Sequence, residues 1–291
     1  MLVSIIIPHY NNGQRLQEVL EAISYQNFDK DSFEVLVVDN QSSESLDFID
    51  EYPFVKLLHE NQFLNSPYSA RNRGIENARG SILAFLDSTC KPSENWLKEG
   101  VKEILDGADI TSGNIQFTFT LKPGITELYD SIFHVNAQSS ARNGFVLGGN
   151  FFIRSSLFQD LGIYPEGQRT SGDYLFSNKV VRKGYKLTFC PTAIVYYPAR
   201  GGKFILKKTW RISKGQPFIW ELKNRFTLQF IKSFFKLIPP NPFRIYKLSK
   251  DRLSRKVGVR EFIQLYFLRY SMLSVSLFGN LEVIIRKKLK K

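Results

Sequence analysis

The chain has 291 residues, of which 43% are hydrophobic and 14% aromatic, a globular composition that excludes disordered and collagen-like proteins. Its formal net charge of +13 is concentrated in residues 201–291, which contain 22 Lys and Arg but 4 Asp and Glu. This asymmetry predicts a body at 1–200 and a basic segment at 201–291 that meets phosphate, in a nucleotide, an anionic lipid or a nucleic acid.

Three apolar segments in the first part of the chain read as buried strands that end in polar residues. Val3–Ile7 runs into Pro8-His-Tyr-Asn, Glu34–Val38 runs into Asp39-Asn-Gln-Ser-Ser, and Ser81–Leu86 runs into Asp87-Ser-Thr. Because the carboxyl ends of parallel strands form the ligand crevice of an open α/β sheet, this edge is the expected binding site.

The remaining elements alternate between helical and strand patterns as far as residue 200. Apolar spacing predicts helices at 16–23, 46–49, 69–80, 96–105, 127–144 (with a loop), 155–161 and 174–183. Strands are expected at 55–58, 109–120, 147–153, 187–189 and 193–197. This rhythm predicts a mostly parallel central sheet flanked by helices, with right-handed crossovers. Beyond residue 200, helices are expected at 204–212, 222–238 and 259–278, the second ending at Pro239-Pro240.

The two cysteines and the apolar runs predict a cytoplasmic protein. Cys90 and Cys190 are too few for a disulfide framework, so a reducing compartment is expected. The chain enters a strand directly after Met1, which predicts no secretory signal. Tyr270–Leu281 has 12 uncharged residues where about 20 are needed to span a bilayer, so no membrane span is expected.

An ordered set of motifs resembles the family-2 inverting glycosyltransferases of the GT-A fold over roughly residues 2 to 200. The motifs are Pro8-His-Tyr-Asn11, Val38-Asp-Asn-Gln-Ser42, Ala70-Arg-Asn-Arg-Gly74, Gly80-Ser-Ile-Leu-Ala-Phe-Leu-Asp87, Gly148-Gly-Asn150 and Gly172-Asp173. The resemblance implies a GT-A-type α/β nucleotide-binding fold with a basic helical extension. It also implies sugar transfer from a nucleoside diphosphate sugar, a UDP-sugar above all, to a hydroxyl of a lipid-linked or polysaccharide acceptor in cell-surface glycan or exopolysaccharide synthesis.

The resemblance assigns the nucleotide to the first strand ends. Pro8, Tyr10 and Asp39 would hold the base and ribose, and Arg71 would approach the diphosphate or base. Two of these residues have a structural alternative. Asp39 could be a turn or helix-capping residue, and Arg71 could be a charge on the surface of a helix.

Asp173 is the expected catalytic base, because an inverting transfer needs one carboxylate to deprotonate the attacking acceptor hydroxyl. Its alternative role is capping the helix that begins near Tyr174. Gly149 and Asn150 would line the acceptor or sugar pocket. Trp96 is assigned to the same pocket, with packing in the core as its alternative.

The metal-binding motif of the family is incomplete in this chain. The resemblance implies a divalent cation, Mg²⁺ or Mn²⁺, at an Asp-x-Asp motif that bridges the sugar-nucleotide diphosphate. Here Asp87 is followed by Ser88 and Thr89 in place of the second acid, and Tyr197 stands where relatives often have a histidine. Metal dependence is therefore an open prediction.

The basic segment and the incomplete metal motif together leave three hypotheses open. Lys and Arg interleaved with aromatic residues predict basic amphipathic helices on the anionic inner face of the plasma membrane. A nucleic-acid binder is the less favoured reading, because no nucleic-acid-binding module is recognisable. The incomplete metal motif motivates an alternative to catalysis, a weakly active GT-A domain that binds sugar nucleotides or glycans as a subunit.

Overall fold

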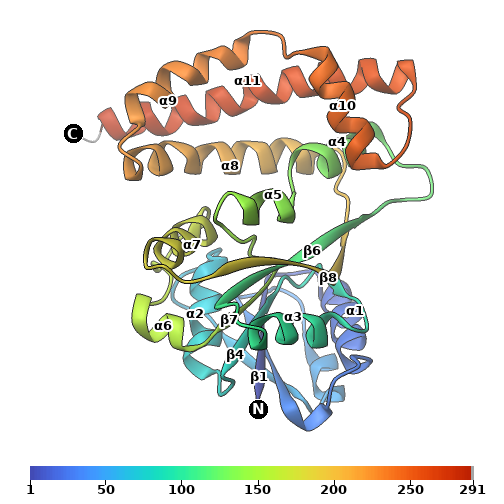
Figure 1. Ribbon diagram of the computed structural model, residues 1–291, viewed down its shortest axis with the longest axis vertical. Coiled ribbons are helices and arrows are strands. Elements are labelled where there is room, and N and C mark those ends of the chain that lie inside the picture. Colours follow the sequence, from blue (N-terminus) through green and yellow to red (C-terminus); the bar gives the residue numbers. More distant parts are fainter. Residues whose placement is uncertain (290–291) are drawn as a thin grey trace. The chain divides into compact units, whose positions relative to one another are not determined.

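The computed structural model describes residues 1–289, which form two compact units (Figure 1). Unit 1 contains Met1–Phe117 and Asn136–Pro198, and unit 2 contains Thr118–Val135 together with the chain from Ala199 onward. The units differ from the predicted domains in one segment, because residues 118–135 group with the C-terminal helices. The division into domains at 1–200 and 201–291 stays a prediction.

Unit 1 is built on an eight-stranded sheet of order β3-β2-β1-β4-β7-β6-β8-β5. The strands are β1 (Val3–His9), β2 (Phe33–Asp39), β3 (Val55–His59), β4 (Ile82–Leu86), β5 (Lys91–Pro92), β6 (Ile110–Thr118), β7 (Asn150–Arg154) and β8 (Leu187–Pro198). β3, β2, β1 and β4 pair in parallel, whereas β7 is antiparallel to β4 and β6, and β5 is antiparallel to β8. The predicted α/β fold is confirmed, with a sheet that is mixed beyond β4.

The two short strands expected after residue 187 are one continuous strand, β8, which passes through Pro191. This proline is exposed, and β5 pairs with β8 only at Val195 and Tyr196. A proline is tolerated where a strand lacks a partner on one side, since its missing N–H then leaves no ladder bond unmade. The two glycines Gly148 and Gly149, expected inside a strand, precede β7 instead.

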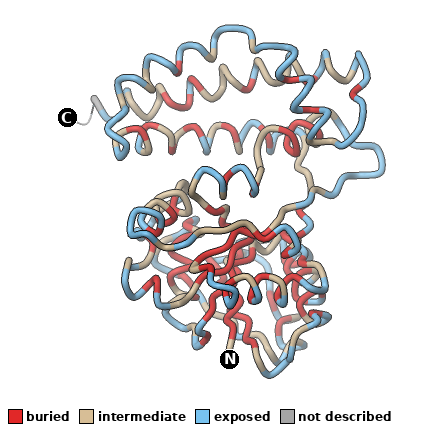
Figure 2. Tube along the Cα trace, in the orientation of Figure 1, coloured by how far each residue is buried: buried red, intermediate tan, exposed pale blue. Residues whose placement is uncertain are grey.

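Helices cover both faces of the sheet. The helices of unit 1 are α1 (Gly13–Ser24), α2 (Pro67–Asn77), α3 (Trp96–Leu105), α5 (Ala137–Arg142), α6 (Ser156–Leu161) and α7 (Gly172–Arg182), with 3₁₀ turns at Lys30–Ser32 and Asp47–Glu51. Ile5 and Ile7 belong to the core that includes α1 and α3, and Ile6 belongs to the core that includes residues of α2, α6 and α7. Figure 2 shows the central strands largely buried, and the residues of β1, β2, β4 and β7 are nearly all buried, whereas β3 and parts of β6 and β8 are partly exposed. Burial on both faces explains why the central strands are apolar until they reach their ends.

Unit 2 is helical. It contains α4 (Ile125–Phe133), α8 (Lys203–Leu222), α9 (Phe226–Ser233), a 3₁₀ turn at Phe234–Leu237, α10 (Pro242–Leu253) and α11 (Val259–Leu289). Leu128 and Ile132 of α4 pack with Ile205 of α8 and Leu265 and Met272 of α11. The helix expected at 204–212 is longer and continues through Pro217 as α8. The helix expected at 222–238 is split, with α9 and a 3₁₀ turn in its place. The sequence did not predict α10.

A buried ionic cluster joins α4 to α8 within unit 2. Asp130 is fully buried, and its Oδ1 lies 2.8 Å from both Lys208 Nζ and His134 Nδ1. Its Oδ2 accepts a hydrogen bond from the Arg200 backbone N–H at 3.0 Å. Because a carboxylate without partners would be costly in this interior, these bonds fix α4 to the C-terminal helices.

Helix α11 is longer than the sequence predicted. Its segment Val259–Lys287 is long and apolar enough to cross a membrane by length and composition, with 22% of its apolar window buried. The sequence expectation of no span counted only the run after Arg269, but this cation does not interrupt the helix. Within unit 2, Leu265 and Met272 of α11 belong to the buried core.

Candidate active site

The ends of β1 and β2 bring together residues assigned to the nucleotide. His9 at the end of β1 pairs with Asp39 at the end of β2, so Pro8 and Asp39 lie on neighbouring strand ends. Tyr10 follows β1 and is 53% exposed. The buried Asp39 carboxylate accepts hydrogen bonds from the Ser42 backbone N–H and hydroxyl, which is the turn role expected as its alternative.

Arg71 is the centre of the most polar buried cluster in unit 1. Its side chain is 4% exposed, and Nη2 lies 2.9 Å from Asp87 Oδ1 and 3.1 Å from the Gly148 carbonyl oxygen. Its Nη1 lies 3.7 Å from Asp173 Oδ1. Arg71 therefore holds the carboxylate that follows β4 and the carboxylate that begins α7. The sequence assigned this guanidinium to the diphosphate or base of the nucleotide, and that assignment stays a prediction; its partners within the protein are two carboxylates.

Asp173 has one carboxylate oxygen held and one without a hydrogen-bond partner among the described residues. Oδ2 accepts hydrogen bonds from the Tyr68 hydroxyl at 3.2 Å and from the Gly148 backbone N–H at 3.1 Å. Oδ1 is buried and accepts no hydrogen bond. Burial raises the pKa of Asp173, the Arg71 guanidinium opposes this shift, and Asp87 adds to it. A carboxylate of raised pKa with an available lone pair is suited to accept a proton.

Tyr68 is a functional candidate that the sequence analysis missed. It lies three residues before Arg71 on α2, so the two side chains share a helix face. The Arg71 guanidinium lies 5.1 Å from the centre of the Tyr68 ring. Burial and then Asp173 raise the pKa of Tyr68, which keeps its hydroxyl a neutral donor to Asp173. The i, i+3 spacing of Tyr68 and Arg71 is visible in the sequence. It indicates a functional role for Tyr68 only once Asp173 is known to accept its hydrogen bond.

Glycines allow these groups to approach one another. A Cβ on Gly148 would lie 2.7 Å from Arg71 Nη2 and 2.8 Å from Asp173 Oδ1, and a Cβ on Gly172 would lie 2.5 Å from the Tyr68 ring. Real Cβ atoms do not come this close, so a side chain at either position would force Arg71, Asp173 or Tyr68 to shift. The Gly-Gly and Gly-Asp pairs of the sequence are thus part of the geometry of the cluster.

The structure does not bring the predicted acceptor-pocket residues Trp96 and Asn150 to a surface. Both are fully buried, and Trp96 Nε1 donates to Asn150 Oδ1 at 2.8 Å. The Asn150 amide nitrogen donates to the carbonyl oxygens of Asn114 and Ala193. Their hydrogen bonds are directed inward, which matches the core alternative for Trp96. Gly149 does lie at the cluster, where its Cβ would be 3.0 Å from Asp87 Oδ2.

The residues near Asp87 do not form a complete cation site by themselves. The Asp87 side chain is 42% exposed, and its Oδ1 is paired with Arg71. Tyr197 is 9% exposed and packs edge-on against Phe117, with 5.5 Å between ring centres. Within residues 1–289, no three His, Cys, Asp or Glu side chains are grouped closely enough to hold a metal ion. A single carboxylate fits only a cation that takes its other ligands from substrate phosphates and water, as Mg²⁺ commonly does.

Comparisons with known proteins agree on one family. The model of "Glycosyl transferase family 2" matches residues 4–162. Glycosyltransferase AglE of Haloferax volcanii is 33% identical over 297 aligned positions, which cover 98% of this chain and 97% of AglE. The poly(ribitol-phosphate) β-N-acetylglucosaminyltransferase TarS of Staphylococcus aureus is 26% identical over 219 positions, 69% of this chain but 36% of TarS.

Solved structures show the same fold. The mannosyltransferase PcManGT of Pyrobaculum calidifontis, in complex with GDP-Man and Mn²⁺, matches with a TM-score of 0.67 and 16% identity, over 97% of this chain and 86% of that one. A structure of TarS residues 1–349 with UDP-GlcNAc matches with a TM-score of 0.60 and 18% identity, over 100% of this chain and 93% of that one.

Proposed function

The chain belongs to glycosyl transferase family 2 and is a glycosyltransferase, and we propose that it transfers a sugar with inversion from a nucleoside diphosphate sugar to a hydroxyl of a lipid-linked or polysaccharide acceptor. Synthesis of a cell-surface glycan is the proposed setting. The observation that carries the proposal is the cluster in which Arg71 pairs with both Asp87 and Asp173 while Asp173 Oδ1 has no hydrogen-bond partner.

The proposed mechanism uses Asp173 as general base. The Asp173 carboxylate accepts the proton of the acceptor hydroxyl while the hydroxyl oxygen attacks the anomeric carbon from the face opposite the diphosphate. The bond between the anomeric carbon and the diphosphate oxygen breaks, and its electron pair leaves with the nucleoside diphosphate. Tyr68 and the Gly148 N–H hold Oδ2, so the carboxylate is oriented before the acceptor binds. Burial supports this role because it raises the pKa and strengthens the base.

The donor nucleotide is proposed to bind at the ends of β1 and β2, with Pro8, Tyr10 and Asp39 around its base and ribose and Asp87 near its diphosphate. A divalent cation, Mg²⁺ or Mn²⁺, would be held by Asp87 and would supply positive charge to the leaving diphosphate. The single carboxylate at this position supports a cation that arrives with the nucleotide. A UDP-sugar is the proposed donor. PcManGT and TarS were solved with GDP-Man and UDP-GlcNAc respectively, so the base needs a direct test.

Thermal unfolding with UDP, GDP, dTDP and CMP, each with and without Mn²⁺, tests the donor site. We expect UDP with Mn²⁺ to raise the Tm by several degrees, because a ligand at about 100 times its Kd adds about 2.7 kcal/mol to the free energy of unfolding. Mn²⁺ alone should not shift the Tm. An equal shift with Mn²⁺ alone would contradict the proposal of a nucleotide-borne cation, and no shift with any nucleotide would favour the alternative of an inactive subunit.

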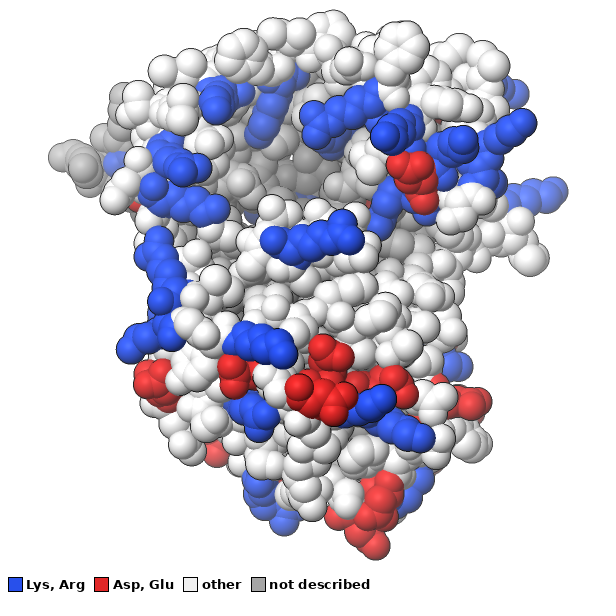
Figure 3. All heavy atoms as spheres, in the orientation of Figure 1, with Lys and Arg blue, Asp and Glu red and all other residues white. Residues whose placement is uncertain are grey.

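Unit 2 supports a location on the cytoplasmic face of the plasma membrane. Residues 222–250 contain seven Lys and Arg and no Asp or Glu. In the same stretch Phe235 is 62% exposed, Ile238 55% and Phe243 84%. On the face shown in Figure 3, Lys and Arg far outnumber Asp and Glu over the helices of unit 2. Exposed aromatic and aliphatic side chains beside cations are suited to the headgroup region of an anionic bilayer.

Liposome cosedimentation tests this location. We expect the protein to pellet with vesicles that contain phosphatidylglycerol and to stay in solution with phosphatidylcholine vesicles, with binding weakened by salt. Replacing Phe235, Ile238 and Phe243 by serine should release most of the protein, because the apolar contribution is lost. Leu105→Ser, at a 58% exposed position of α3, is the matched control and should bind normally. Equal binding to both lipid types would exclude an electrostatic contribution.

A further inference from the structure

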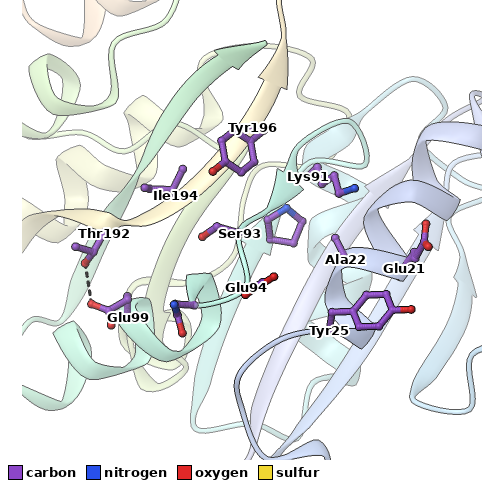
Figure 4. Close-up of a pocket in the computed structure, with 12 residues that line it drawn as sticks. Glu21, Ala22, Tyr25, Lys91, Ser93, Glu94, Glu99, Thr192, Ile194 and Tyr196 are labelled. Carbon is purple, nitrogen blue, oxygen red and sulfur yellow. Dashed lines mark hydrogen bonds between the residues drawn. The ribbon is translucent and has the colours of Figure 1, made fainter.

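Unit 1 has a second concave site, outside the Arg71 cluster. A pocket of about 710 Å³ lies among the C-terminal part of α1, β5 and the loop after it, the start of α3, and β8. This volume is within the range of small-molecule binding sites. Figure 4 shows its lining side chains, which come from three parts of the chain far apart in sequence. None of them takes part in the proposed transfer mechanism.

Two exposed tyrosines contribute aromatic surface to this pocket. Tyr25 follows α1 and is 69% exposed, and Tyr196 lies on β8 and is 38% exposed. In Figure 4, Ser93 and Glu94 lie between them. A tyrosine ring offers an apolar face for the C–H groups of a ligand and a hydroxyl for hydrogen bonding, so an exposed pair in a pocket suits a ligand that has both kinds of group.

The charges of the pocket narrow the ligand class. Glu21, Glu94 and Glu99 line it against a single cation, Lys91, so a phosphate-bearing ligand would be repelled. A divalent cation is not expected either, because no three His, Cys, Asp or Glu among residues 1–289 are close enough to hold one. Glu99 is oriented by the Thr192 hydroxyl, which donates to its Oε2 at 2.8 Å. Carboxylates are strong acceptors, so a neutral ligand rich in hydroxyl donors matches this lining.

The pocket is adjacent in sequence to the candidate active site. Lys91 is four residues after Asp87, so their Cα atoms are at most about 14 Å apart even for a fully extended chain. A glycan of a few sugar residues can cover this distance. A saccharide whose terminal hydroxyl is at Asp87 is therefore long enough to reach Lys91, the lining residue nearest to Asp87 in sequence.

We propose that this pocket binds neutral sugar residues of the glycan acceptor, away from the hydroxyl that reacts. Tyr25 and Tyr196 contact the apolar faces of the sugar rings, and the carboxylates of Glu21 and Glu94 accept hydrogen bonds from ring hydroxyls. The proposal rests on the proposed transfer of a sugar to a glycan. It makes the pocket a determinant of acceptor specificity that is separate from the donor site.

Saturation-transfer NMR on the full chain tests the proposal with three neutral probes, maltotriose, mannotriose and N,N′,N″-triacetylchitotriose. We expect at least one trisaccharide to bind, and Tyr25→Ala and Tyr196→Ala each to weaken its affinity by about tenfold, the equivalent of about 1.4 kcal/mol. Tyr246→Ala, at a 40% exposed tyrosine of unit 2, is the matched control and should leave the affinity unchanged.

Nucleotide binding measured on the same samples separates this proposal from the proposed function. If UDP or GDP binds but no trisaccharide does, or if both tyrosine variants bind the probe as the unchanged protein does, the pocket proposal is wrong. If a trisaccharide binds through these tyrosines while no nucleotide binds, the pocket stands and the proposed donor site is wrong. Binding of both, with only the trisaccharide affected by Tyr25→Ala and Tyr196→Ala, supports both.

Discussion

Replacing Asp173 by asparagine is expected to lower the turnover number by about 10²- to 10⁴-fold, the range that a general base contributes. The amide keeps the size of the side chain and can still accept hydrogen bonds from Tyr68 and Gly148, but it cannot take the proton of the acceptor hydroxyl. Nucleotide affinity and the Tm should change little. The measurement is a steady-state transfer assay together with nucleotide titration.

A matched control for this variant is Asp160→Asn. Asp160 accepts a hydrogen bond from the Tyr185 hydroxyl at an exposed site outside the Arg71 cluster. The turnover of Asp160→Asn should equal that of the unchanged protein.

Turnover in the unchanged protein should also rise with pH through the pKa of Asp173, because only the ionised carboxylate accepts a proton. Unaltered turnover in Asp173→Asn would remove Asp173 as the base.

Replacing Arg71 by methionine is expected to lower the free energy of unfolding by about 3 kcal/mol at neutral pH, near the low end for breaking a buried ion pair. Asp173, whose side chain is 19% exposed, would lose its ion pair with Arg71. Asp87 is 42% exposed and can be hydrated, so it contributes less to this cost. The measurement is urea unfolding. Arg15→Met, which removes an exposed pair with Glu18, should cost less than about 1 kcal/mol.

The pH dependence of the Arg71→Met defect identifies its cause. The folded-state pKa of Asp173 is raised above the ordinary value of 3.8, so the stability that comes from its protonated form is lost as pH rises through the folded-state pKa. Without Arg71 this pKa rises further. The difference in unfolding free energy between the two proteins should therefore shrink toward pH 4, and Asp173→Asn added to Arg71→Met should restore stability at neutral pH. A defect that is independent of pH would indicate lost packing instead of an unpaired carboxylate.

The sequence predicted the parallel half of the sheet well because each strand and helix there has a strong local pattern. Apolar runs such as Val3–Ile7 and the polar residues after them locate both the strands and the binding edge. The later, antiparallel strands carry no local sign of their direction. Pairing of β7 between β4 and β6 depends on the fold of the whole unit, so periodicity could not predict it.

The sequence identified residues of the candidate site but not their contacts, because contacts between elements far apart in the chain leave no local pattern. Motif positions identified Asp87, Arg71 and Asp173, but their mutual contacts depend on α2, β4 and α7 meeting in space. The assignment of Arg71 to the nucleotide stays a prediction, and its ion pairs with two carboxylates could not be read from the sequence. Trp96 was assigned to the acceptor pocket with core packing as its alternative, and helix α3 places it in the core, where Asn150 accepts a hydrogen bond from its indole N–H. The local sequence does not specify whether Trp96 at the start of α3 points to the core or to a ligand.

The discontinuous chain path of unit 2 has a consequence for biosynthesis. Helix α4 leaves the ribosome well before the helices that cover Leu128 and Ile132 and before Lys208, the partner of Asp130. Until about 150 further residues have been made, as far as Leu265 and Met272 of α11, α4 lacks its native packing. Unit 2 can thus be completed only after α11 has been synthesised, and a nascent chain stalled near residue 200 would present an apolar helix to chaperones. Premature termination there is expected to yield an aggregating fragment even though the strands of unit 1 have all been made.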